Sequence, residues 1–405
     1  MNDDTAHMAR ALALGRTAAN DTDPNPRVGC VLIAPDGRLI GQGCTQRAGG
    51  PHAEIMALRD AQAAGENTRG ASAYVTLEPC AHHGRTPPCA DALLAAGIAR
   101  VIAALPDPNP RVAGQGLARL RAAGVQVQAG ACPQAAQQAF EDNIGFFSRM
   151  VRRRPWVRLK MAASLDGITA LADGQSQWIT SAAARADGHH WRTRASAILT
   201  GSGTVRHDNP QLTARPPGPP PPRQPALILL DSQLRTPLTA RLWQTPARPV
   251  HLCTTIADPA RHAPYQALGA HIHPLPASAS GQISLPALPP LLAQLEINEL
   301  HVEAGHTLAG ALLQAELVDE CLLYLAPCLL GPGQSLAALP PLPHLNAALR
   351  LRFHEIRPLG DDLRLRARPP ERENFWPEAT RLWQKLSIDS SCFDSALRSI
   401  YGRCG

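Results

Sequence analysis

The sequence is short of lysine and cysteine, and both shortages bear on what the protein can be. Lysine occurs only at positions 160 and 385, so arginine, spread along the chain, carries the net charge of +6. The one tight basic run is Arg152, Arg153 and Arg154; a run this short is typical of a solvated linker, and we expect no nucleic-acid partner. Ten cysteines in 405 residues are too few for a disulfide scaffold and indicate a reducing cytoplasm.

Long apolar runs are also missing. Charge, proline or glycine interrupts every apolar stretch well before the roughly 20 residues that a membrane-spanning helix needs. The N-terminal segment MNDDTAHMARAL lacks the basic-then-apolar layout of a secretory signal. We therefore expect a cytoplasmic protein with no membrane partner. A chain of 405 residues exceeds one ordinary hydrophobic core, so two domains are expected.

The first part of the chain alternates helical and strand patterns. The patterns predict helices over 5–20, 53–64, 88–96, 116–123 and 134–149, and strands over 28–34, 39–43, 73–77, 100–105 and 125–129. A Pro-Asp-Gly turn joins the first two strands into a hairpin. This order predicts an α/β/α sandwich with a mixed sheet over residues 1–148.

A second α/β domain is expected over residues 149–368, and the boundary segment RMVRRRPW opens it. Strands are expected at 156–167, 196–205, 226–232 and 248–254, and a strand, glycine loop, helix and strand over 299–327. The proline run at 216–222 predicts an extended surface loop. Residues 369–405 form an extension to which the sequence assigns no role.

Four residues in the first domain have the chemistry of a catalytic metal site. PHAEIMAL contains His52 and Glu54, and EPCAHHGRTPPCADAL contains Cys80 and Cys89. One imidazole and two thiolates suit Zn²⁺ and leave a fourth position for water. Residues two apart on a regular helix do not share a face. We therefore expect His52 at the mouth of its helix, where it can converge with Glu54.

This set of residues predicts hydrolytic deamination of an amino-bearing heterocycle. Zinc lowers the pKa of bound water from about 15.7 to about 7, and Glu54 would carry the proton to the ring and then to the leaving ammonia. The alternative is a closed structural zinc site with His82 or His83 as the fourth ligand. The combination of His-Ala-Glu, Pro-Cys and a second cysteine at a helix start favours the catalytic interpretation.

The second domain carries weaker signals. It has no GxGxxG motif. Gly305 follows the strand ELHVEA and precedes HTLAGALL, and a glycine turn that opens a helix presents N–H groups suited to a cofactor phosphate. TGSGTV is a second turn of this kind. On the residues alone, two ordinary tight turns explain both segments equally well.

Several segments together resemble the bifunctional deaminase/reductases of riboflavin biosynthesis. They are TDPNPRVGC, HAEIMAL, YVTLEPCAHHGRTPPCADAL and LPDPNPRVAGQGL in the first half, and LKMAASLDGITA, SQWITS, AILTGSGTVRHDNPQLT and HVEAGHTLAGALLQAELVDE in the second. The likeness spans roughly residues 5–366. It implies an N-terminal cytidine-deaminase-like domain and a C-terminal dihydrofolate-reductase-like domain.

The resemblance also implies a two-step reaction. The first step is zinc-dependent deamination of 2,5-diamino-6-ribosylamino-4(3H)-pyrimidinone 5′-phosphate. NADPH then reduces the ribosyl group, which gives 5-amino-6-ribitylaminouracil 5′-phosphate. The implied partner is this small pyrimidine ribotide, and the implied assembly is a homo-oligomer formed through the reductase domain.

The resemblance assigns roles to individual residues. His52, Cys80 and Cys89 would hold zinc, and Glu54 would be the catalytic proton shuttle. The implied NADPH contacts are Ala162, Trp178, Thr204, Asp208, Ser232, Gly305, His306, Thr307, Leu308, Ala309, Gly310 and Ala311. The implied substrate contacts are Asn25, Ser176, Arg192, Leu212, Arg215 and Glu303, with the two arginines as bidentate donors to the 5′-phosphate. Asp23 and His306 stand where the family more often has His and Pro.

Two other functions remain as alternatives. One is a nucleic-acid base deaminase fused to an unrelated reductase-like domain, and the other is a non-catalytic, zinc-stabilised binding protein. The wide spacing of the two cysteines, the missing basic patch and the second domain argue against the first. Glu54 argues against the second, because a structural zinc site has no use for an unligated carboxylate.

Overall fold

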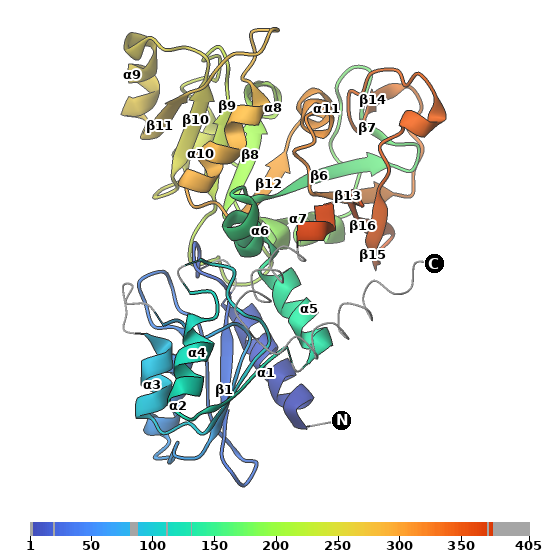
Figure 1. The fold of residues 1–405 in the computed structure, drawn as a ribbon. Helices are drawn as coiled ribbons and strands as arrows, with labels where there is room; N and C mark the ends of the chain where they lie inside the picture. The colour runs from blue at the N-terminus through green and yellow to red at the C-terminus, as the bar shows by residue number, and fades with distance from the viewer. Residues whose placement is uncertain are drawn as a thin grey trace. The chain divides into compact units, whose positions relative to one another are not determined.

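A computed structural model describes residues 3–18, 21–81, 88–110, 112–130, 132–370 and 372–375 (Figure 1). The chain divides into two compact units, Met1–Arg152 with Phe375–Gly405, and Arg153–Asn374. The change from the first unit to the second falls inside the expected boundary segment RMVRRRPW. Within the described part of the chain, every helix falls short of the length and apolar character needed to cross a bilayer.

The first unit is built on a five-stranded mixed sheet with the order β2-β1-β3-β4-β5. Its strands are β1 Gly29–Ile33, β2 Leu39–Cys44, β3 Ser72–Val75, β4 Arg100–Ala103 and β5 Gln126–Ala129. β1 runs antiparallel to both β2 and β3, whereas β3, β4 and β5 are parallel. The predicted hairpin and mixed sheet are confirmed.

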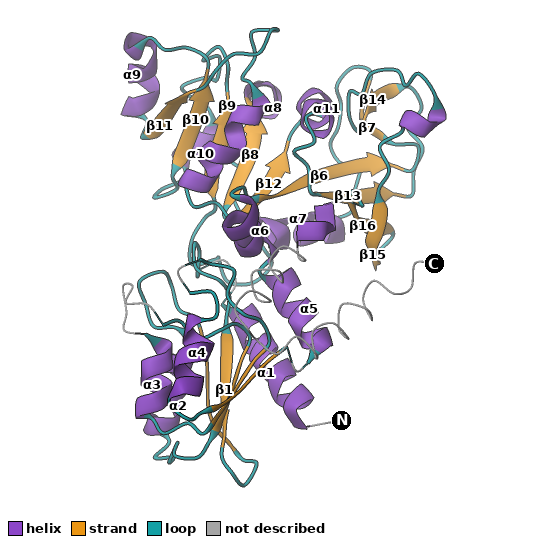
Figure 2. Ribbon diagram, viewed as in Figure 1, coloured by secondary structure: helices purple, strands orange, loops and turns teal. Residues whose placement is uncertain are grey.

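Helices cover both faces of this sheet (Figure 2). They are α1 Asp3–Thr17, α2 Ala53–Ala63, α3 Cys89–Ala95, α4 Gln115–Ala122, α5 Pro133–Asp142 and α6 Ile144–Arg152. α1 packs on the sheet and against α5, while α2 packs on the sheet and against α3, which in turn contacts α4. Gly29 lets α1 approach β1 closely, since a Cβ there would lie 1.8 Å from the carbonyl oxygen of Ala11. The expected α/β/α sandwich is confirmed.

The helix expected over 134–149 is two helices, α5 and α6, separated at Asn143. The Asn143 side chain accepts a hydrogen bond from the N–H of Arg27 and donates to the carbonyl oxygens of Arg27 and Ala139. An asparagine that bonds to distant backbone competes with continuation of the helix. The break therefore depends on a tertiary contact that the helical pattern does not reveal.

The second unit contains a nine-stranded sheet with the order β11-β10-β9-β8-β12-β6-β13-β16-β15. Its strands are β6 Trp156–Ser164, β8 Ala197–Gly201, β9 Ala226–Leu230, β10 Val250–Thr254, β11 Ala270–Pro274, β12 Glu299–Glu303, β13 Glu320–Ala326, β15 Arg352–Leu359 and β16 Asp362–Arg368. The strands from β11 to β13 are parallel, and β16 and β15 complete the sheet antiparallel. β7 Ile168–Leu171 and β14 Gly333–Ser335 pair separately.

The helices of this unit are α7 Ala182–Arg194, α8 Ser202–Asp208, α9 Pro259–Ala267, α10 Leu288–Gln294 and α11 His306–Gln314. Short 3-10 turns occur at Arg241–Gln244, Leu285–Ala287, Leu345–Ala347 and Arg372–Phe375. Two apolar cores include alternate residues of the parallel strands, with Leu199 and Ile228 in one and Ile198 and Leu227 in the other. The segment expected as a strand and turn over 196–205 is β8 followed directly by α8. The proline run at 216–222 has no helix or strand, as expected.

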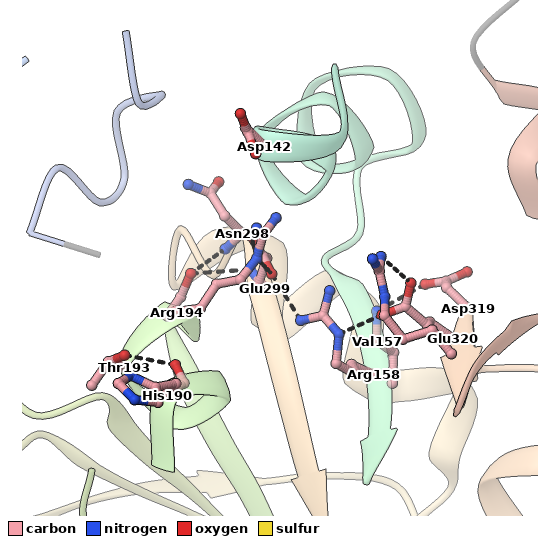
Figure 3. Close-up of polar contacts among 12 residues, drawn as sticks. Asp142, Val157, Arg158, His190, Thr193, Arg194, Asn298, Glu299, Asp319 and Glu320 are labelled. Atoms are coloured by element: carbon pink, nitrogen blue, oxygen red, sulfur yellow. Dashed lines mark hydrogen bonds and ion pairs between the residues drawn. The ribbon is translucent and has the colours of Figure 1, made fainter. Parts of the chain in front are cut away.

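Buried ion pairs tie the middle of the nine-stranded sheet together (Figure 3). Arg158 on β6 pairs with Glu299 on β12 at 2.9 Å and with Glu320 on β13 at 2.6 Å. Glu299 also accepts from Arg194 of α7, and Glu320 from Arg366 and Arg368 of β16. This network fixes α7 to the sheet. The position of α7 matters because the helix supplies residues to the site described below.

Candidate functional site

The first unit brings one imidazole and two thiols together. Each of His52, Cys80 and Cys89 offers one ligand atom, and the three atoms lie within 4.8 Å of one another. The Nδ1 of His52 lies 3.6 Å from the Sγ of Cys80 and 3.3 Å from the Sγ of Cys89. Separations of this size allow one tetrahedral zinc ion to contact all three atoms.

Local structure places each of the three side chains. His52 is the residue that precedes α2, in extended conformation, so it stands at the mouth of the helix as expected. Cys89 is the first residue of α3, and its backbone N–H donates to the Sγ of Cys80 at 3.3 Å. The positive end of a helix favours thiolate over thiol.

The protonation states of the group suit a metal. A hydrogen bond from Cys89 holds the pKa of Cys80 well below its usual range, with His52 adding to the effect. The same bond raises the pKa of Cys89, so the two sulfurs share one proton. Cysteine binds zinc as thiolate, so zinc binding would release the protons that the two sulfurs still carry.

Glu54 lies in the first turn of α2 and is only 3% exposed. Burial raises the pKa of Glu54 to about 7, and the nearby His52 opposes the rise. The carboxyl group is not one of the three ligand groups. A carboxyl group with this pKa can both accept and donate a proton near neutral pH.

Two further buried carboxyl groups, which the sequence interpretation missed, support this centre. Glu78 accepts hydrogen bonds from the backbone N–H groups of Asp107, Gly114, Gly116 and Leu117, at 2.8–3.2 Å. It thereby holds the loop after β4 beside Cys80. Burial raises the pKa of Asp107 to about 8. The glycines of AGQGL are the available sequence signal, because a Cβ on Gly116 would lie 1.8 Å from the carbonyl oxygen of Pro79.

The sequence interpretation of this centre also includes His82, His83 and Asn25. His82 and His83, the candidate fourth ligands, lie outside the described residues. Asn25 lies before β1, where its backbone N–H donates to the carbonyl oxygen of Thr22 at 2.9 Å. No hydrogen bond within the described part of the chain links Asn25 to the metal-ligand group.

The second unit has a cavity of about 1240 Å³ at the carboxyl ends of its parallel strands. This is the edge of an open α/β sheet at which ligands bind in general. Its wall includes most residues that the family resemblance implies: Ala162, Ser176, Trp178, Arg192, Thr204, Asp208, Leu212, Ser232, Glu303, Gly305, His306, Thr307, Leu308 and Ala311.

Two expected cofactor contacts face elsewhere. Ala309 is fully buried in the apolar core beneath α11. Gly310 packs against the backbone of Ala338, where a Cβ would lie 2.2 Å from the carbonyl oxygen. The helical period explains the first of these, because the residues of α11 that follow its first turn and still line the cavity, Ala311 and Gln314, lie on the face opposite the buried Ala309.

Arg192 and Glu303 form a pair within this wall. The Nε and Nη2 of Arg192 donate to the two carboxylate oxygens of Glu303, the second at 2.8 Å. Burial alone would raise the pKa of Glu303, but Arg192 outweighs it and holds that pKa well below its usual range. The sequence interpretation treated the two residues as separate substrate contacts, whereas the structure joins them.

Arg215 lies in an adjoining cavity of about 540 Å³, together with Lys160, Arg185, His189, Arg192 and Tyr324. The Nη1 of Arg215 donates to the side chains of Thr213 and Gln211, the latter at 3.2 Å, and its backbone N–H donates to the Nδ1 of His189. Burial lowers the pKa of His189 to about 4, helped by Arg192 and Arg215, so the imidazole is neutral and can accept. The wall of this cavity carries three arginines, Arg185, Arg192 and Arg215, against one carboxylate, Glu303, so it is suited to an anion.

His189 and Tyr324 are residues of this second site that sequence reasoning missed. His189 was expected on the helix surface, but it is half-buried and faces Arg215. The hydroxyl of Tyr324 donates to Asp187 at 2.7 Å. No local motif marks either residue, because each reaches the cavity only through the packing of α7 against β13.

Comparison with known proteins matches both units. The family model of the RibD C-terminal domain matches residues 155–365, and that of the cytidine and deoxycytidylate deaminase zinc-binding region matches residues 1–105. The riboflavin biosynthesis protein RibD of Escherichia coli K12 is 47% identical over 373 residues, which cover 89% of this chain and 98% of that protein. RibD of Aquifex aeolicus is 38% identical and covers 89% of this chain and 97% of its own.

Solved structures give the same result. RibD of Acinetobacter baumannii superimposes with a TM-score of 0.82 at 40% identity, over 91% of this chain and 99% of that one. The diaminohydroxyphosphoribosylaminopyrimidine deaminase/5-amino-6-(5-phosphoribosylamino)uracil reductase of Thermotoga maritima superimposes with a TM-score of 0.79 at 30% identity, over the same shares. The likeness covers both units, so it identifies the arrangement of two activities on one chain.

Proposed function

The chain belongs to the RibD family of bifunctional deaminase/reductases in riboflavin biosynthesis, and from this premise we propose the part that each residue of the two sites plays. The enzyme uses zinc and NADPH. It deaminates 2,5-diamino-6-ribosylamino-4(3H)-pyrimidinone 5′-phosphate and then reduces the ribosyl group of the product. The match over both units leaves no support for a nucleic-acid base deaminase with an unrelated second domain.

His52, Cys80 and Cys89 hold the zinc ion of the deaminase, and the Cys80 thiolate prepares the site for a cation. When bound, the ion supplies an activated water. Glu54 takes a proton from the attacking water and delivers it to the ring nitrogen; it then takes the proton of the added hydroxyl group and delivers it to the departing amino group, which leaves as ammonia. Its burial keeps the carboxyl group near the pKa that both transfers need.

The cavity of the second unit takes NADPH, which supplies the hydride. The first turn of α11 presents N–H groups to a cofactor phosphate. Arg215 binds the 5′-phosphate of the ribotide, and Arg192, oriented by Glu303, lies beside it. These side chains hold the sugar against the nicotinamide, and such positioning contributes much of the catalysis in hydride transfer.

We also propose that the enzyme works in the cytoplasm as a homo-oligomer formed through the reductase domain. The edge strand β15 exposes large apolar side chains, with Phe353 at 66% and Ile356 at 58%. Exposed apolar side chains on a sheet edge indicate an interface. Light scattering of the purified chain tests this proposal. The parent should have the mass of an oligomer, and a Phe353→Glu variant should have a smaller mass.

The observation that carries the proposal is the convergence of three ligand atoms within 4.8 Å beside a buried carboxyl group. The test incubates the purified chain with the diaminopyrimidinone ribotide, with and without NADPH, and follows ammonia and cofactor oxidation separately. Ammonia should appear without NADPH, and NADPH oxidation should follow deamination. NADPH oxidation without ammonia release would contradict the proposed order.

A further inference from the structure

The segment between α8 and the proline-rich loop carries two of the proposed substrate contacts, Leu212 and Arg215. Leu212 is 3% exposed and has a φ of 54°. A branched side chain seldom adopts this left-handed conformation, and it persists only where surrounding contacts enforce it. The contacts that enforce it here identify residues that shape the site.

Four successive carbonyl groups of this segment accept hydrogen bonds from side chains. The Nη1 of Arg248 donates to the carbonyl oxygens of Gln211 and Leu212, at 2.8 and 2.9 Å. Arg192 donates to that of Thr213 at 2.9 Å, and Gln224 to that of Ala214 at 3.0 Å. The conformation of the segment therefore depends on side chains that come from three distant positions.

Arg248 is the buried member of this group. It is 7% exposed, and its Nη2 donates to the carbonyl oxygen of Leu242 at 2.5 Å. No ion pair of Arg248 occurs within the described part of the chain. Burial lowers the pKa of Arg248 to about 10, with Arg192 adding to the effect, so the side chain stays charged at neutral pH. A buried cation that bonds only to backbone carbonyls acts as a fixed anchor for them.

Peptide geometry links this anchor to the site. In a trans peptide the N–H points opposite to the C=O of the same group. The N–H groups of Leu212 and Thr213 share peptide groups with the two carbonyls that Arg248 holds, so they point away from Arg248. Within the described residues, neither N–H has a hydrogen-bond acceptor. Leu212 lines the large cavity.

We propose that Arg248 is a positioning residue of the reductase site: it holds the peptide group between Gln211 and Leu212 so that the N–H of Leu212, which lines the large cavity, faces the substrate phosphate alongside Arg215 of the adjoining cavity. The inference rests on the proposed role of Arg215 and Leu212 in ribotide binding. Arg248 does not touch the substrate itself. Its effect is on the affinity for the phosphorylated substrate, because it sets the direction of this donor.

The test measures steady-state NADPH oxidation by the full-length Arg248→Met enzyme with the deaminated ribotide. We expect the KM for the ribotide to rise about tenfold, because the anchored donor loses its direction. We expect kcat to stay within about twofold and the NADPH dissociation constant to be unchanged, since the two residues whose carbonyl groups Arg248 holds, Gln211 and Leu212, are not among the proposed NADPH contacts. The KM of Arg248→Lys for the ribotide should lie between those of the parent enzyme and Arg248→Met. Added ethylguanidinium should lower the KM of Arg248→Ala.

Two controls separate this inference from the function on which it rests. Arg154→Met removes another largely buried guanidinium, which donates to the carbonyl oxygen of Leu317 and to Asp319, and it should lower the melting temperature without changing the ribotide KM. Arg215→Ala should raise the KM. If Arg215→Ala raises the KM and Arg248→Met leaves it unchanged, the positioning role is refuted. If Arg215→Ala leaves the KM unchanged, the proposed phosphate site itself is refuted. A general loss of kcat and NADPH affinity in Arg248→Met would also refute positioning, and if that variant does not fold, Arg248→Lys supplies the same measurement.

Discussion

Replacing Glu54 by glutamine separates the chemistry of the deaminase site from its metal binding. The carboxamide has nearly the same volume and cannot shuttle a proton. Because Glu54 is not one of the three ligand groups, zinc content should stay at one ion per chain. Loss of a general acid–base residue lowers rates by about 10²–10⁴, which corresponds to roughly 3–5 kcal/mol of transition-state stabilisation.

The same substitution should stabilise the metal-free fold. Burial raises the folded-state pKa of Glu54 from 4.5 to about 7. A carboxyl group whose pKa is raised by folding favours the folded state while it is protonated, and this advantage is lost as pH rises from about 4.5 through about 7. The difference of about 2.5 units corresponds to roughly 3 kcal/mol. Glutamine, which has no charge to bury, should therefore give a higher melting temperature above about pH 7 and no advantage below about pH 4.5.

Three measurements on the Glu54→Gln protein check this reasoning: ammonia release, NADPH oxidation with the deaminated ribotide, and thermal unfolding after chelation at several pH values. Deamination should fall while the reductase rate stays unchanged. A parallel loss of both rates would refute two independent sites. A chelated variant no more stable than the parent at high pH would refute the burial argument.

Other substitutions test the remaining features. Cys80→Ser should lose zinc as measured by elemental analysis, whereas Cys44→Ser, a half-exposed thiol outside the ligand group, should keep it. Glu320→Gln should lower the free energy of unfolding by about 3–5 kcal/mol, because it leaves buried guanidinium groups uncompensated. Burial alone would raise the pKa of Glu320, but its arginine partners hold that pKa well below 4.5. The stability that the Glu320 ion pairs contribute is therefore present above about pH 4.5 and is lost in acid. Thermal unfolding of the parent protein from neutral pH downward measures this loss. Truncation after Phe375 should leave both activities unchanged, whereas removal of Phe375 as well should lower the melting temperature of the first unit, because its ring packs on Phe140.

The deaminase centre could be predicted from the sequence because its chemistry and its local structure are both encoded locally. A histidine and two cysteines before helical patterns predict a zinc site and also the helix starts that place the ligands. The structure finds His52 before α2 and Cys89 at the start of α3. The buried support was not predicted. Glu78 acts through backbone N–H groups of a loop about thirty residues later, and a carboxylate that bonds to backbone leaves no pattern of side chains in the sequence.

The reductase site could be predicted only in part, because its shape comes from contacts across the sheet. The family resemblance indicates which residues line the cavity, but it does not reveal that Arg192 and Glu303 are one ion pair. Nor does local propensity predict a positive φ at Leu212, since leucine disfavours it. That conformation depends on Arg248, which lies in a different segment and bonds only to carbonyl oxygens. Every residue has the same backbone carbonyl group, so a side chain that binds carbonyl oxygens requires no particular residue type at the partner position. Such a contact therefore leaves no pattern in the sequence. Residues of this kind become visible only when the donors and acceptors of a binding loop are accounted for one by one, and here that accounting leads to Arg248.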